Sequence, residues 1–158
     1  MDNINDEIQN LLDTYDRRKN LNAEAQKAKQ QREYKFLEEF LKFRTEIAQP
    51  LFEEIANTIH ARGHDAKILF DNGANRIGSC NSDITFYLSL ATDDRSTYPG
   101  NRGRLFTLFA SKRYQNVRIH WNNGLAEGLQ PEVYKISQLT RNQLEEKLMD
   151  FIIASFRN

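Results

Sequence analysis

The sequence predicts an α+β fold: N-terminal helices, an antiparallel four-stranded β-meander, and a C-terminal helix packed on one face of the sheet. Three observations support this fold class. Apolar residues recur with a helical period up to Gly63, alternate with a period of two from there to about residue 121, and return to a helical period after Thr140. Helices, then a run of strands, then a helix are the element order of an α+β domain. The length of 158 residues suits one such domain.

Residues 1–33 are predicted to form a helical arm or coiled-coil segment, followed by a globular α+β domain over residues 34–158. The arm contains no Gly or Pro and is rich in residues that favour helix. Five apolar residues at spacings of three and four give its start one apolar face: Ile4, Ile8, Leu11, Leu12 and Tyr15. Few apolar residues follow, so the arm is a helical spacer or one strand of a weak coiled coil, with a mostly disordered charged N-terminus as the alternative. A cap at Asn20 or Asn22 would divide it into two helices.

A helix rich in phenylalanine follows the arm. Phe36, Phe40 and Phe43 share one side of this helix. A second apolar stripe follows another side: Tyr34, Leu37 and Leu41. Because two apolar stripes imply burial against two surfaces, one of these surfaces is a candidate for contact with another chain.

Proline and glycine mark the next helix. Pro50 predicts a break at Ala48 to Gln49, because proline fits the first turn of a helix and not its interior. A second helix is therefore predicted from Pro50 to about Arg62. Gly63 is expected to end it in a left-handed conformation.

The sheet is predicted from segments in which apolar and polar residues alternate. Residues 82–91 show this alternation most clearly, and further strands are predicted at residues 67–71, 104–111 and 115–121. Their connections are too short for parallel crossovers, so a β-meander follows. A fifth, short strand at residues 133–135 stays open. The last helix begins with a capping box formed by Thr140 and Gln143, and its apolar residues share one face.

Charge gives only a local signal. The chain has 22 basic and 22 acidic residues, so net charge does not favour nucleic acid, an anionic membrane or an acidic substrate. Between residues 95 and 126, however, there are basic residues and no acidic one: Arg95, Arg102, Arg104, Lys112, Arg113 and Arg118. Aromatic residues lie among them, a mixture typical of proteins that bind single-stranded nucleic acid. The alternatives are an acidic protein partner and a basic sheet face that is simply solvated.

Residues that could support catalysis do not form a convincing site. His60 and His64 have the spacing of a helical metal pair, but Gly63 lies between them and is expected to end the helix first. Cys80 has no neighbouring base that would activate it, and the Asp83 strand lacks the second carboxylate of a two-metal site. We therefore predict no catalytic residue, no cofactor and no metal site. A small enzyme using these residues or His120 is the weakest hypothesis.

The predicted function is a non-enzymatic module for protein–protein interaction or oligomerisation, as a subunit or adaptor of a larger assembly. It would associate, with itself or with another protein, through its N-terminal helices, because an exposed polar helix has little use in a catalytic domain. The predicted interface consists of Ile4, Ile8, Leu11, Leu12, Tyr15, Phe36, Phe40 and Phe43. The alternative is a nucleic-acid-binding accessory protein that uses the basic sheet face of residues 95–121.

The sequence also bears on localisation. No apolar run approaches the roughly 20 residues of a membrane helix, and the first residues lack the basic and apolar regions of a signal peptide. The single cysteine suits a reducing compartment. A cytoplasmic location without membrane contact is the expectation.

Overall fold

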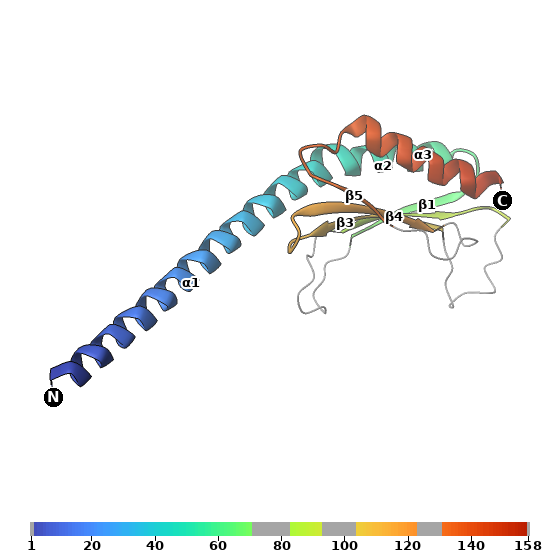
Figure 1. Cartoon of the computed structure of the whole chain (residues 1–158). Helices are drawn as coiled ribbons and strands as arrows, with labels where there is room; N and C mark the ends of the chain where they lie inside the picture. The colour runs from blue at the N-terminus through green and yellow to red at the C-terminus, as the bar shows by residue number, and fades with distance from the viewer. Residues whose placement is uncertain (1, 71–82, 93–103, 123–130, 158) are drawn as a thin grey trace. The chain divides into compact units, whose positions relative to one another are not determined.

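The computed structural model describes residues 2–70, 83–92, 104–122 and 131–157. The chain divides into two units, Met1–Lys35 and Phe36–Asn158. The second unit is an α+β domain with an antiparallel sheet and helices (Figure 1). The predicted fold class is therefore confirmed.

Helix α1 spans Asp2–Phe43 without interruption. Neither Asn20 nor Asn22 divides it. Its residues up to 43 contain no Gly or Pro, so every backbone N–H after the first turn is available to the helical ladder. The arm is thus one helix rather than two.

The predicted break before Pro50 is wrong, because the backbone stays helical there. A π-helical turn, η1, covers Arg44–Ala48 and leads directly into α2, Gln49–His60. The N–H of Gln49 donates to the carbonyl of Arg44, five residues earlier. Pro50 has no N–H, and in a regular α-helix its ring would clash with the carbonyl four residues before it. The wider π-turn accommodates this clash without ending the helix.

The end of α2 follows the prediction. Gly63 has a positive φ of 89°. Its N–H donates to the carbonyl of His60 at 3.0 Å, and the N–H of His64 donates to the carbonyl of Ile59 at 3.4 Å. This pair of bonds is a Schellman motif, which satisfies the last carbonyls of the helix and turns the chain into the first strand.

The sheet is a meander of five strands rather than the predicted four. Neighbours in sequence pair antiparallel in the order β1-β2-β3-β4-β5. The strands are β1 Asp65–Phe70, β2 Ile84–Ser89, β3 Arg104–Ser111, β4 Asn116–Asn122 and β5 Glu132–Tyr134. The extra strand is the short segment that the sequence left open. Its three residues are too few to show alternation, and pairing with β4 is what orders them as a strand.

Helices α2 and α3 cover one face of this sheet (Figure 1). Helix α3 spans Arg141–Arg157 and begins with the predicted capping box. The N–H of Thr140 donates to Oε1 of Gln143 at 3.0 Å, and the N–H of Gln143 donates to Oγ1 of Thr140 at 3.2 Å. Two N–H groups of the helix start are satisfied in this way.

The core lies between the two helices and the sheet. Phe52 of α2 and Phe151 of α3 are fully buried, and each contacts the rings of Phe86 and Phe106. The ring centroids of these pairs are 5.7 to 6.5 Å apart. Trp121 also faces inward, with its ring 5.9 Å from that of Phe151. These aromatic contacts hold both helices on the same face of the sheet.

Candidate functional site

An exposed apolar stripe lies on the first four turns of α1. The exposed fractions are 63% for Ile4, 47% for Ile8, 70% for Leu11, 51% for Leu12 and 63% for Tyr15. These positions follow one another at helical spacing, so they lie on one side of the helix. Clustered large apolar residues of this exposure mark interaction surfaces more often than isolated ones.

The three phenylalanines predicted at the same interface are not exposed. Phe36, Phe40 and Phe43 are 4%, 0% and 7% exposed, and they belong to the hydrophobic core of the second unit. Because this unit already covers their side chains, they are unavailable to a partner. We therefore remove them from the interface and keep only the stripe on α1, which we call the α1 stripe.

The predicted basic residues do not share one surface. Arg104 lies on the same side of β3 as the buried Phe106 and pairs with Leu88, whereas Arg118 pairs with Phe109 on the opposite side. Arg95 and Arg102 lie outside the described residues. Arg104 therefore does not belong to the sheet face that carries Arg118. Alternation along β3 could have shown this from the sequence.

Two of the basic residues meet at the turn between β3 and β4. The guanidinium carbons of Arg113 and Arg118 lie 5.3 and 5.6 Å from the centroid of the Tyr114 ring. Tyr114 is 59% exposed. Gln115 takes a positive φ of 52°, which closes the turn and returns the chain toward Arg118. The sequence places Arg113 beside Tyr114, but only the hairpin brings Arg118 to it.

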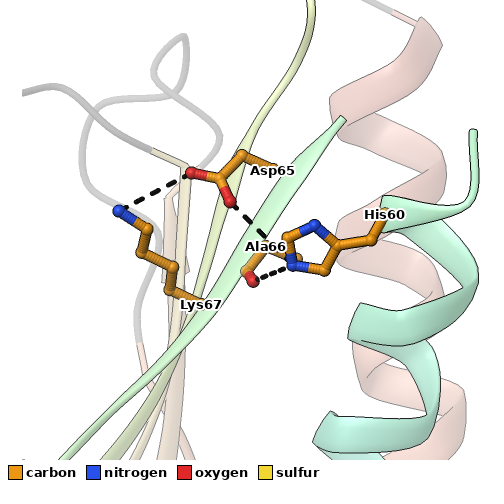
Figure 2. Close-up of polar contacts among 4 residues, drawn as sticks. All are labelled: His60, Asp65, Ala66 and Lys67. Carbon is orange, nitrogen blue, oxygen red and sulfur yellow. Dashed lines mark hydrogen bonds and ion pairs between the residues drawn. The ribbon is translucent and has the colours of Figure 1, made fainter. Parts of the chain in front are cut away.

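The two histidines that have the spacing of a metal pair contact backbone atoms (Figure 2 shows His60). Nε2 of His60 is 2.8 Å from the carbonyl oxygen of Ala66 and 3.9 Å from Oδ1 of Asp65. Oδ2 of Asp65 is 3.7 Å from Nζ of Lys67. Nδ1 of His64 accepts a hydrogen bond from the N–H of Ala91 at 2.9 Å. These contacts join the end of α2 to the first two strands.

A polar triad joins β5 to α3. The hydroxyl of Tyr134 donates to Glu132 at 2.6 Å, and Nζ of Lys147 donates to the same carboxylate at 3.1 Å. Burial and then the Glu132 bond raise the pKa of Tyr134 to about 12. The bond from Tyr134, aided by Lys147, lowers the pKa of Glu132, and the same carboxylate raises the pKa of Lys147. All three groups are part-exposed, so the triad is a surface contact that connects β5 to α3.

The remaining polar residues that could support chemistry include Cys80, Asp83 and His120. Within the described ranges, no three His, Cys, Asp or Glu side chains lie together as metal ligands would. Cys80 lies outside these ranges. Oδ1 of Asp83 accepts a bond from the N–H of Ala110 at 3.4 Å, which places this carboxylate at the sheet. His120 pairs with Thr107 across β3 and β4.

A second exposed apolar stripe, on α3, was missed by the sequence analysis. Met149, Ile153 and Phe156 are 40%, 40% and 44% exposed. The ring of Phe156 lies 5.0 Å from the ring of His64. The helical spacing of Met149, Ile153 and Phe156, four and then three residues apart, could have predicted this stripe from the sequence.

Comparisons of the chain with protein-family models, with curated proteins and with solved structures found no match. In the part of the chain that the structure describes, no helix has the length and apolarity needed to cross a membrane.

Proposed function

We propose that this protein is a non-enzymatic module that self-associates through the α1 stripe, as a subunit or adaptor of a larger assembly. The observation that supports the proposal is the contrast between the two units. The second unit buries a core around Phe52, Phe86 and Phe151 and leaves its stripe on α3 40–44% exposed, whereas the α1 stripe leaves five large apolar side chains about half exposed or more.

The magnitude of the apolar effect is compatible with association. Fully burying a large apolar side chain contributes roughly 1.5–3 kcal/mol, so covering the exposed part of each stripe residue contributes about 1–2 kcal/mol. Five residues on each of two helices then give on the order of 10–20 kcal/mol before the cost of association. That cost is about 4–15 kcal/mol. The balance favours a dimer of moderate affinity.

The test is a pair of substitutions in the full-length chain. Ile8→Gln with Leu11→Gln removes the centre of the α1 stripe and leaves charge unchanged. The matched control is Tyr34→Gln, which removes another exposed residue of α1, 66% exposed, outside the stripe. Sedimentation equilibrium should show a self-associating wild type and control, and a predominantly monomeric double variant. A monomeric wild type, or a double variant that associates as well as the wild type, would reject the proposal.

A second candidate function is binding of single-stranded nucleic acid at the β3–β4 turn. The observation in its favour is the exposed Tyr114 ring with the guanidinium groups of Arg113 and Arg118 beside it, in a segment from residue 104 to residue 122 that has no acidic residue. Cations attract phosphates, and an exposed ring can stack on a base. Affinity for a labelled oligonucleotide, followed by fluorescence anisotropy, should fall with salt and with Arg113→Ala. Arg157→Ala serves as the control, and binding that is flat with protein concentration at low salt would end this candidate.

A further inference from the structure

The charges of the arm are separated along its length. Residues 1–16 contain five acidic residues and no basic one, whereas residues 17–35 contain seven basic residues and two acidic ones. Residues 2–16 and residues 17–35 belong to one continuous helix. We call them the acidic segment and the basic segment. The α1 stripe lies entirely in the acidic segment, where Glu7 borders it and the other four acidic residues lie farther round the helix.

We infer that two copies of this chain pair their α1 helices antiparallel, so that the acidic segment of each copy covers the basic segment of the other. The inference rests on the proposed self-association and adds the orientation and the contact surface. Parallel pairing in register would place acidic segment on acidic segment and basic segment on basic segment. Antiparallel pairing over the length of the arm replaces these two repulsions by two attractions. The two attractive contacts are equivalent by symmetry.

The heptad positions support this orientation. Ile4, Ile8, Leu11 and Tyr15 are spaced four, three and four residues apart, as the contact positions of a coiled coil are. The same register continues through the basic segment at Arg18, Asn22, Ala25, Lys29 and Arg32. In a parallel pair, three of these contact layers would bring a cation against the same cation of the partner. Such layers oppose parallel pairing along half of the arm.

Antiparallel layers instead combine unlike residues. With the contact positions aligned, Ile8 lies opposite Ala25 of the second copy, and Ile4 lies opposite Lys29. Long basic side chains cover apolar surface with their aliphatic stems while their charged ends stay in water. Here those ends lie near the acidic segment of the partner. The stripe residues at contact positions are thereby covered without bringing the two acidic segments together.

Pulsed electron spin resonance on the full-length chain tests the orientation. One nitroxide label per chain is placed at Asn10 or at Ala23, both exposed, with Cys80→Ser in each variant. A rise of 1.5 Å per residue and an axis separation of about 8–10 Å give expected label separations of roughly 20–25 Å at both sites. Parallel pairing would give about 10 Å at both. Antiparallel overlap of the acidic segments alone would give about 10 Å at residue 10 and about 40 Å at residue 23.

Either of these last two patterns would overturn the inference while leaving self-association intact. A wild-type chain without dipolar coupling, monomeric by sedimentation, would overturn the proposed function and the inference with it.

The salt dependence of the dissociation constant tests the orientation independently. Antiparallel pairs attract, so the dissociation constant should rise as salt increases, whereas parallel pairs repel and their dissociation constant should fall. The triple reversal Lys27→Glu, Lys29→Glu and Arg32→Glu should weaken association about tenfold or more at low salt. Arg62→Glu, an exposed reversal outside the arm, should leave it unchanged. A triple variant that associates as tightly as the wild type would overturn the inference.

Discussion

Phe40 and Leu11 lie on the same helix, and their substitution to alanine should have opposite consequences. The side chain of Phe40 is 0% exposed and belongs to the core of the second unit, whereas that of Leu11 is 70% exposed. If this assignment is correct, Phe40→Ala changes the stability of the domain and leaves self-association alone. Leu11→Ala changes self-association and leaves the domain alone.

The magnitude for Phe40 follows from its complete burial. Removing a fully buried phenylalanine side chain costs about 3–5 kcal/mol of unfolding free energy, because apolar contacts are lost and a cavity is left. Domains of this size are stable by about 5–15 kcal/mol, so the variant should lose about a fifth of its stability or more. Leu11→Ala removes a side chain that is mostly in water, and its effect on unfolding of the second unit should stay below about 0.5 kcal/mol.

Urea denaturation followed by the fluorescence of Trp121 measures this difference, because the ring packs against Phe151 in the core. The midpoint for Phe40→Ala should shift equally at two protein concentrations about 50-fold apart, since a monomeric core does not depend on mass action. Two outcomes would refute the burial of Phe40 by its own chain. One is a loss of stability that becomes smaller at the higher protein concentration. The other is a Phe40→Ala variant that dissociates while its denaturation midpoint is unchanged.

Three further predictions concern the folded domain. Gly63→Ala should lower the unfolding free energy by about 1 kcal/mol in urea denaturation, because the positive φ of 89° strains any residue with a Cβ atom; an unchanged midpoint would contradict the left-handed helix end. Thr140→Ala should cost about 1 kcal/mol by thermal denaturation, since the capping box is lost, and Thr140→Ser should recover most of it. The folded pKa of Glu132 lies below its ordinary value of 4.5, so the stabilising contribution of the carboxylate is present above that value and is lost as pH falls through the folded pKa. Tyr134, with its pKa raised from 10.0 to about 12, contributes stability that is lost as pH rises between these values. Glu132→Gln should reduce the pH dependence of the unfolding free energy in both ranges, by less than about 1 kcal/mol, because the triad with Lys147 is part-exposed. Denaturation over a range of pH measures this change. Equal pH profiles for variant and wild type would show that the triad contributes nothing.

The repeating patterns of the sequence determined most of the fold. The strand patterns of residues 82–91 and 104–111 correctly predicted β2 and β3, and the Thr140 capping box correctly placed the start of α3. Gly63 correctly ended α2. Each of these is a local signal, because the residue that causes the structure lies within a few positions of its effect.

Features that depend on distant partners were decided by the tertiary structure. Strand β5 forms because β4 offers it an edge, and the helix continues past Pro50 through a π-turn within a packed domain. The apolar period of α1 was correctly found, but periodicity alone does not say which apolar residues are covered. Phe40 is buried and Leu11 is exposed, although both lie on helical stripes of the same sequence, because only the second unit supplies a sheet and two helices to cover one of them.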